Sequence, residues 1–290
     1  MSQTRDKSYW TRIIRPEKKW FDLDLKELFH YRDLILLLAK RNFSLIYKQT
    51  ILGPAWVLIQ PLLTSAVLTA VFGVIAGLPT DGVPTFLFYL CGYIPWHYFA
   101  KCLTGCSKTF LENRDVFGKV YFPRMAVPLS TALYQLLDFA VQFAFFLLLL
   151  AGYLIFSDVP LAPDIGLILL SIPALLQLAV LGIGFGTLVS ALTTRYRDLA
   201  LLVDFGVTLW MYASPVAYSA SVVSERMPQL EWLYMSNPIS CVIQLFRCAY
   251  MGADTALLRY YPISAAVTVI AFAAGIMLFS HTEKTFMDTI

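Results

Sequence analysis

The sequence predicts an all-α integral membrane protein with six transmembrane helices, an amphipathic N-terminal interface helix and a re-entrant half-helix pair before the last span. Hydrophobic residues make up 58% of the 290 residues and charged residues only 14%, whereas about a quarter of the residues in a soluble domain are charged. Several apolar stretches reach the roughly 20 residues that a helix needs to cross the hydrocarbon core. Lysine and arginine gather in every second segment that connects these stretches.

The first 50 residues are predicted to form a cytoplasmic tail and an amphipathic helix. They hold 11 of the 22 lysines and arginines, mixed with acids, so they do not resemble a nucleic-acid-binding arm. Asp24 and Glu27 mark a helix start, and the apolar run 34–39 is too short to span. Either this helix lies among the lipid headgroups, or it docks on a cytoplasmic partner, and both can hold. No signal peptide is visible.

Residues 51–290 are predicted to form the transmembrane domain. Gly53 and Pro54 open the first span, since proline in a first turn loses no hydrogen bond, and Pro61 should kink it. Lys101 should lie where the second span leaves the hydrocarbon. The predicted spans are residues 51–77, 85–110, 125–156, 165–192, 199–218 and 262–280.

The distribution of positive charge orients these spans. The segments assigned to the cytoplasm are 1–50, 101–124, 193–200 and 281–290, with 11, 5, 2 and 1 lysines and arginines. The two short outer turns hold none, and the other three cations lie in the outer segment 219–261. Cytoplasmic loops of membrane proteins carry such an excess. Both termini are therefore predicted in the cytoplasm, which requires an even number of spans.

The outer segment 219–261 is too apolar for a simple loop. Between Asn237-Pro238 and Gly252 it holds a stretch of 13 residues, which is too short to cross the membrane. We predict a re-entrant pair of half-helices, in which Arg247 needs a polar cavity or a partner. The alternative is a folded extracellular cap that lies on the membrane.

Motifs of enzymes are missing from the sequence. It has no GxxxxGK[ST] phosphate loop, no HExxH and no GxSxG, so we expect neither an enzyme nor a bound cofactor. Cys102 and Cys106 are four residues apart, but no histidine or acid joins them as a metal ligand, and packing is the simpler explanation. Gly182, Gly186 and Ser190 have the spacing of a close helix–helix contact.

One acid falls deep inside a predicted span. Asp138 shares a helix face with Thr131, Gln135 and Gln142, at spacings of 4, 3 and 4 residues. A buried acid in a bilayer needs a partner or water, so this face either lines a wet pathway or bonds to a neighbouring helix. Asp204 lies near the start of its span and is interpreted as an interfacial acid.

Aromatic residues crowd the second and fifth spans. Interface belts explain many such residues, but aromatic faces also stack on sugar rings and would suit a glycan pathway. The candidate pathway residues are Tyr89, Tyr93, Trp96, Asp138, Gln142, Trp210 and Tyr212.

Several short motifs, in order along the chain, resemble those of a known family. They are YKQTILGPAW at 47–56, Gln60-Pro61, GYIPW at 92–96, KVYFPR at 119–124, YRD at 196–198, Ser214-Pro215, Asn237-Pro238 and Phe246-Arg247. From about residue 30 onward the chain resembles the polysaccharide and polyol-phosphate export permeases, which are ABC-2 type membrane subunits of ABC transporters.

The resemblance implies a homodimer that binds two copies of a separate P-loop ATPase, which carries ATP and Mg. Such permeases move lipid-linked O-antigen, capsular or teichoic-acid chains outward across the bacterial inner membrane, through a channel between the two permeases. The resemblance also implies an amphipathic helix at the channel entrance, where membrane lipids gather. The implied ATPase-coupling residues are Glu112, Asn113, Arg114, Lys119, Tyr121 and Arg124. The implied outer-gate residues are Asn237, Pro238, Phe246 and Arg247.

The sequence therefore supports the hypothesis of a permease subunit of an ATP-driven exporter of lipid-linked, O-antigen-like polysaccharide. A first alternative is an ABC-2 exporter of a small hydrophobic compound, which aromatic content does not distinguish. A second is a membrane-embedded glycosyl- or acyltransferase, which would need acids or histidines clustered at one membrane face. A third is a structural scaffold, which the charged segment 111–124 disfavours.

Overall fold

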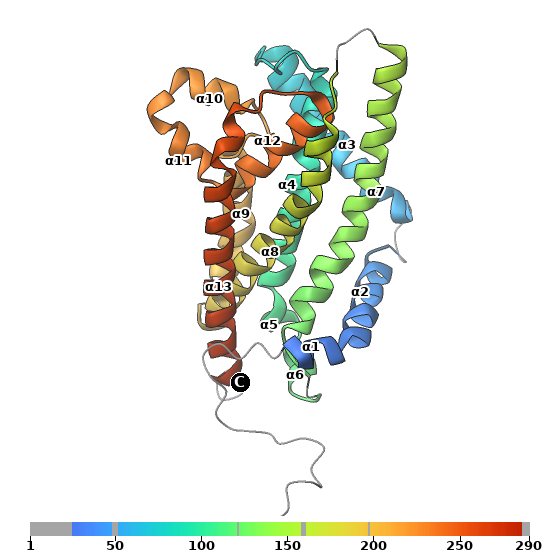
Figure 1. Ribbon diagram of the computed structural model, residues 1–290. Helices are drawn as coiled ribbons and strands as arrows, with labels where there is room; N and C mark the ends of the chain where they lie inside the picture. Colours follow the sequence, from blue (N-terminus) through green and yellow to red (C-terminus); the bar gives the residue numbers. More distant parts are fainter. Residues whose placement is uncertain (1–24, 48–51, 121, 158–160, 197, 286–290) are drawn as a thin grey trace, which may run out of the picture.

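The computed structural model describes residues 25–47, 52–120, 122–157, 161–196 and 198–285. These residues form helices and connecting loops, with no strand among them. Four helical stretches are long and apolar enough to cross a membrane, and the bundle they belong to is shown in Figure 1. They are Gly53–Ile75, Ala126–Phe156, Ile165–Thr194 and Ala256–Glu283. The predicted all-helical membrane class is confirmed.

The helices follow the predicted order. The longer ones are α2 (Arg32–Tyr47), α3 (Trp56–Leu68) continued by the π-helical η3 (Thr69–Ile75), α4 (Thr85–Ser107), α7 (Ala126–Phe156), α8 (Ile165–Arg195), α9 (Leu199–Tyr212), α12 (Pro238–Met251) and α13 (Tyr261–Thr285). The shorter ones are α1 (Leu25–His30), η2 (Gly53–Ala55), α5 (Thr109–Glu112), α6 (Arg114–Phe117), α10 (Ala220–Arg226), η4 (Pro228–Leu230), α11 (Glu231–Met235) and η5 (Ala256–Tyr260).

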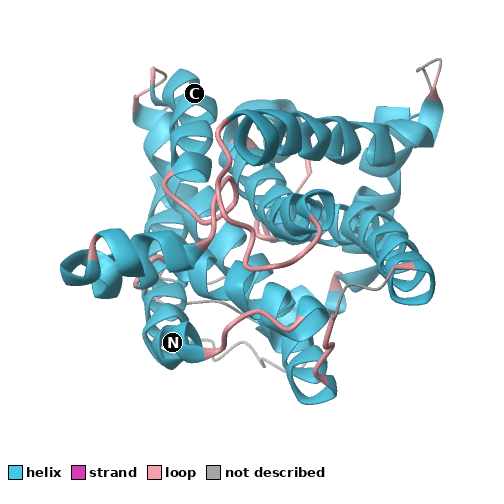
Figure 2. Cartoon of the chain, turned by 90° about the horizontal axis from the view of Figure 1, so that it is seen from above, coloured by secondary structure: helices cyan, strands magenta, loops and turns pink. Residues whose placement is uncertain are grey.

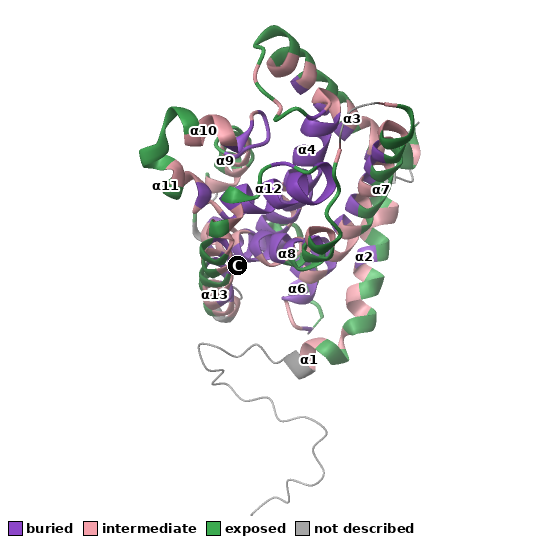
Figure 3. Ribbon diagram, turned by 45° about the horizontal axis from the view of Figure 1, so that its top comes forward, coloured by how far each residue is buried: buried purple, intermediate pink, exposed green. Residues whose placement is uncertain are grey.

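Helix α4 lies in the middle of the bundle. It packs against α8, α7, α12 and α3. Figure 3 shows buried residues gathered on α4, α8 and α12, while α10 and α11 are mostly half-buried or exposed. Its 23 residues are enough to span, yet it is not among the four apolar stretches. Protein surrounds α4 on most sides, so it tolerates residues such as His97 and Tyr98 that lipid would not favour.

The contact between α4 and α8 depends on glycine. A Cβ atom on Gly182 would lie 2.6 Å from the Cβ of Cys102, and one on Gly186 would lie 2.4 Å from the Cβ of Cys106. Both cysteines are fully buried. The predicted close helix–helix contact and the packing role of the two cysteines are confirmed.

Replacing Gly186 by alanine should therefore destabilise the bundle. The added methyl group has no room, and overpacking of this kind typically lowers the free energy of unfolding by about 1–3 kcal/mol. The measurement is thermal unfolding of the purified protein. Gly152→Ala in α7 is the control, because a Cβ there meets no atom within 4 Å. Equal melting temperatures for the two variants would contradict the contact.

Two helix ends differ from the sequence prediction. Helix α9 ends at Tyr212, six residues before the predicted end of the fifth span at 218, because Pro215 disfavours helical backbone at Ser214. The second predicted span, 85–110, is interrupted after Ser107, and α5 and α6 follow as short separate turns.

The N-terminal helix α2 lies against α7, toward the end of the bundle that also holds the C-terminus (Figure 1). Ala39 is buried in this contact, whereas Leu36, Leu37 and Leu45 are 56%, 63% and 68% exposed. The helix therefore has apolar side chains toward the bundle and away from it. An outward apolar surface of this kind suits a lipid interface.

Helix α12 is enclosed by the other helices. All 14 of its residues are buried, and it packs on α4, α8 and α13. Asn237 caps its start by accepting a hydrogen bond from the backbone N–H of Ile239. Gly252 ends it in the left-handed conformation, with φ of 74°. From above, the connecting loops of this end cross over the bundle (Figure 2).

Candidate functional site

A polar groove runs between α4 and α7, with α3 and α2 as its side walls. It consists of two adjoining hollows of about 310 and 230 Å³, which share Gly105, Glu112 and Tyr134. We call it the α4–α7 groove. Its polar lining from α4 and α5 is His97, Lys101, Thr104, Lys108 and Glu112, and its polar lining from α7 is Thr131, Tyr134, Gln135, Asp138 and Gln142.

The two helices present opposite chemistry to this groove. Residues 97, 101, 104 and 108 follow at spacings of 4, 3 and 4, which places them on one face of α4. This face carries the cations Lys101 and Lys108. Residues 135, 138 and 142 form the matching face of α7, where a carboxylate and amides provide acceptors. The groove thus has a cationic wall and an acceptor wall.

His97 joins the two walls at the inner end of the groove. Its Nδ1 atom lies 3.3 Å from Nε2 and 3.4 Å from Oε1 of the Gln142 side chain, and the tautomer of the ring sets which group donates. The ring stacks on Tyr93, with 5.5 Å between ring centroids. With Nδ1 as the acceptor, the proton of a neutral imidazole lies on Nε2. That nitrogen is buried and has no hydrogen-bond partner.

The predicted pathway residues occupy two places. Asp138 and Gln142 line the α4–α7 groove together with Glu112, which the resemblance assigned to ATPase coupling. Tyr93 lies behind the groove, against His97. The prediction did not include His97, Lys101 or Lys108. Their spacing shows in the sequence that they share one helix face, but only the structure shows that this face lies opposite α7.

The remaining pathway residues lie elsewhere in the bundle. Trp96 is 3% exposed and packs on Phe99, with 5.6 Å between centroids. Trp210 packs edge-on against Phe99 and Phe185, at 5.2 and 5.1 Å. Tyr212 is 49% exposed at the end of α9, and Tyr89 is fully buried beside the Arg247 cluster described below.

Asn237 connects the end of α9 to the start of α12. Its Oδ1 accepts a hydrogen bond from Trp210 Nε1 at 3.3 Å, and its Nδ2 donates to Ser214 Oγ at 2.9 Å. Pro238, the first residue of α12, accepts a hydrogen bond from Ser264 of α13 at 2.8 Å. A predicted pathway residue and a predicted gate residue are therefore in direct contact.

Arg247, in α12, lies at the centre of a buried cluster. It is 0% exposed, and its Cζ lies 3.6 Å from the centre of the Phe88 ring, a cation–π contact. Its Nη1 and Nη2 donate to the backbone carbonyls of Tyr218 and Val216, each at 3.4 Å. No carboxylate of the described chain forms an ion pair with it. Phe246, the other gate residue of this motif, packs on Phe143 and Tyr250.

The Arg247 cluster ties four segments together. The guanidinium lies so close to α4 that a Cβ on Gly92 would be 2.6 Å from Nη2. The segment that supplies its carbonyls continues into Ser219 and Ser221, whose hydroxyls donate to the carboxylate of Asp81. Helix α12, helix α4 and the loops 76–84 and 213–219 are thus held by one connected set of polar contacts.

The predicted coupling segment combines an aromatic anchor with a charged surface. Phe117 is buried against Phe110 and Phe122, and Phe110 stacks on Phe279 of α13 at 4.5 Å. Arg124 lies over the Phe117 ring, at 5.5 Å from its centre, and donates to the carbonyl of Glu283 at 2.6 Å. Glu112, Arg114 and Lys119 are exposed, Asn113 is half-buried, and Tyr121 lies outside the described residues.

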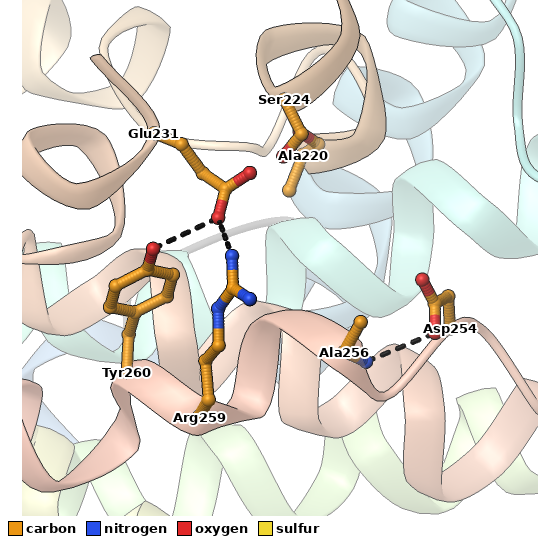
Figure 4. Close-up of polar contacts among 7 residues, drawn as sticks. All are labelled: Ala220, Ser224, Glu231, Asp254, Ala256, Arg259 and Tyr260. Carbon is orange, nitrogen blue, oxygen red and sulfur yellow. Dashed lines mark hydrogen bonds and ion pairs between the residues drawn. The ribbon is translucent and has the colours of Figure 1, made fainter. Parts of the chain in front are cut away.

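An ion pair links helix α11 to η5. Arg259 donates to Glu231 Oε1, and the Tyr260 hydroxyl donates to the same oxygen at 3.0 Å (Figure 4). The hydrogen bond from Arg259 lowers the pKa of Glu231 below its ordinary value of 4.5. This carboxylate therefore stabilises the folded protein in its charged form.

The stability of the region around α11 and η5 should depend on pH in a defined direction. Because folding lowers the pKa of Glu231, its contribution is complete above pH 4.5 and is lost as the pH falls through the folded-state pKa. Thermal unfolding of the wild type and Glu231→Gln should differ near pH 7 and converge in acid. A constant difference between them down to pH 3 would contradict this assignment.

Comparison with known proteins identifies the family. The family model described as "ABC-2 type transporter" matches residues 33–251, which is most of the chain. The chain belongs to the ABC-2 type transporter family. The resemblance found in the short motifs is thereby confirmed, and the chain is a multi-pass membrane protein that acts as the membrane subunit of a transporter.

Relatives of this ABC-2 transporter subunit match over nearly their whole length. The chain is 24% identical over 258 residues to an O-antigen export system permease protein RfbA of Klebsiella pneumoniae, covering 89% of this chain and 95% of the relative. It is 25% identical over 267 residues to a protein of the same name from Myxococcus xanthus, covering 92% and 98%.

Proposed function

We propose that the protein is the permease subunit of an ATP-binding cassette exporter that moves lipid-linked, O-antigen-like polysaccharide to the outer side of the bacterial inner membrane. The observation that carries this proposal is the similarity, over about nine tenths of this chain, to O-antigen export permeases of Klebsiella pneumoniae and Myxococcus xanthus. The family match supports the transporter class independently.

The proposed topology has six crossings, with both termini in the cytoplasm. Helix α4 crosses in addition to the four apolar stretches, because it runs alongside them in the bundle (Figure 1). The sixth crossing is the predicted span 199–218, of which α9 forms the first 14 residues and the largely buried turn 213–218 forms the rest. Helix α12 is re-entrant and is sheltered from lipid by protein, as backbone that does not span requires. The charge distribution supports the orientation, with 19 of 22 lysines and arginines in the cytoplasmic segments.

A separate P-loop ATPase supplies the energy in this proposal, since the sequence has no phosphate loop. Two permease copies form a homodimer and bind two ATPase copies, which hold ATP and Mg. The exposed charges of Glu112, Arg114 and Lys119 face the ATPase, and the aromatic anchor of Phe117 transmits its movement to α13. The residues of the Arg247 cluster and Asn237 hold the outer gate.

A deletion experiment tests the proposal in cells. Removing the gene should abolish surface polysaccharide and leave lipid-linked glycan inside the cytoplasmic membrane, where extraction and gel analysis detect it. A plasmid copy should restore the surface glycan. Unchanged surface glycan in the deletion strain would refute the proposal, and loss of resistance to a small hydrophobic compound instead would favour the drug-exporter alternative.

A further inference from the structure

The α4–α7 groove contains lysines that form no direct ion pair within the described residues, although the carboxylates of Glu112 and Asp138 line the same hollow. The side chain of Lys101 is half-buried, and neither it nor Lys108 makes a hydrogen bond or ion pair within the described residues. His97, which is 9% exposed, adds an Nε2 atom without a partner. A charge at this depth is costly unless an opposite charge or water accompanies it. The α4 face of the groove, with two lysines and the Nε2 atom of His97, is therefore suited to bind an anionic group.

The three groups are spaced along the direction of transport. At 1.5 Å per residue, α4 rises about 35 Å over its 23 residues, which matches a hydrocarbon core of about 30 Å. With α4 centred on the bilayer at its middle residue, Trp96, Lys101 lies about 7.5 Å and Lys108 about 18 Å toward the cytoplasm, so Lys101 is deeper than the hydrocarbon edge at which the sequence predicted it. Lys108 is therefore at headgroup level, while Lys101 and His97 lie inside the membrane.

The opposite wall of the groove, formed mainly by α7, presents hydrogen-bond acceptors. Asp138 and Gln135 offer acceptor atoms on α7, and Trp56 adds an aromatic face from α3. A phosphate alone would not use these groups, and a carboxylate facing it would be repulsive. Sugar hydroxyls donate to carboxylates and amides, and sugar rings pack on indole faces. A ligand that suits both walls therefore carries a phosphate and a sugar on adjacent atoms.

We propose that the α4–α7 groove binds the glycosyl phosphate headgroup of a lipid within a single subunit. The phosphate enters at Lys108 and is held at Lys101 and His97, while the first sugar contacts Asp138 and Trp56. The larger hollow, about 310 Å³, is at the small end of ligand pockets, so it accommodates a headgroup and not a long glycan. This inference rests on the proposed function, whose substrate end it names.

Binding to the purified full-length protein in detergent tests the inference by calorimetry. The probes are farnesyl diphosphoryl-N-acetylglucosamine, farnesyl diphosphate without sugar, and dihexanoyl phosphatidylglycerol. Lys101→Gln should raise the Kd of both diphosphate probes at least about 10-fold, as loss of a charged hydrogen-bond donor typically does. Asp138→Asn should weaken only the glycosylated probe. Lys119→Gln, an exposed lysine outside the groove, is the control and should change neither.

Two results would overturn the site. One is wild-type affinity in Lys101→Gln, and the other is phosphatidylglycerol binding as tightly as the glycosylated probe, which would mark an ordinary phospholipid site. If Lys101→Gln does not fold, Thr104→Leu is used instead, because leucine fills the groove without changing its charge. This variant should no longer bind the glycosylated probe, and undiminished binding of the probe would refute the site. ATP-driven glycan export from vesicles without probe binding would refute this site alone, while probe binding without export would refute the proposed function alone.

Discussion

Replacing Arg247 by methionine is expected to open the outer end of the bundle and to reduce export at least about 10-fold. Methionine keeps much of the side-chain volume but loses the donors to the carbonyls of Val216 and Tyr218 and the contact with the Phe88 ring. Hydrogen bonds from a charged group contribute about 1.5–3 kcal/mol each. The two carbonyls then lose their partner, and α12 is no longer tied to α4.

The measurement combines thermal unfolding with uptake of a small dye from the outer side in cells that express the variant. Arg247→Met should melt at a lower temperature and admit the dye. Arg226→Met is the matched control, because Arg226 is exposed and has no polar partner in the described chain. If the two variants have the same melting temperature and the same dye uptake, the Arg247 cluster does not hold the outer end closed.

Replacing Phe117 by alanine is expected to uncouple the permease from its ATPase. Phe117 is 5% exposed and contacts Phe110, Phe122 and the guanidinium of Arg124. Truncating a buried phenylalanine typically lowers stability by about 3–5 kcal/mol. The cavity would loosen the segment that carries Glu112 and Lys119 while leaving the distant outer end intact.

Val116→Ala is the control, since Val116 is the neighbouring residue and is 40% exposed. Both variants should reach the membrane in similar amounts, but only Phe117→Ala should lose co-purification with the ATPase and export. Normal ATPase association of Phe117→Ala would contradict the view that this aromatic anchor holds the coupling surface in place.

Features that depend on one helix and the solvent around it could be predicted from the sequence. The all-helical membrane class follows from long apolar runs, and the α4–α8 contact follows from small residues every four positions. Helix α12 was bounded correctly, because Asn237-Pro238 and Gly252 are local start and stop signals. The family followed from motifs that lie in order along the chain.

Features that depend on which helices face each other could not be predicted. Helix α4 is buried on most sides, so its hydropathy does not tell which of Tyr89, Tyr93, Trp96 and His97 faces a cavity. The face of Asp138 was recognised as polar, but its opposite wall on α4 was not. The end of α9 was placed six residues too late because Ser214-Pro215 was assigned to the span and not to its termination.

Reconstituted transport tests the central claim most directly. The purified permease and its ATPase are placed in vesicles with lipid-linked glycan inside, so that a lectin outside detects only exported chains. We expect lectin binding to rise when ATP and Mg are supplied to the ATPase side, and to stay at background without ATP or with Arg247→Met. Glycan that stays inside in the presence of active ATPase would contradict the account.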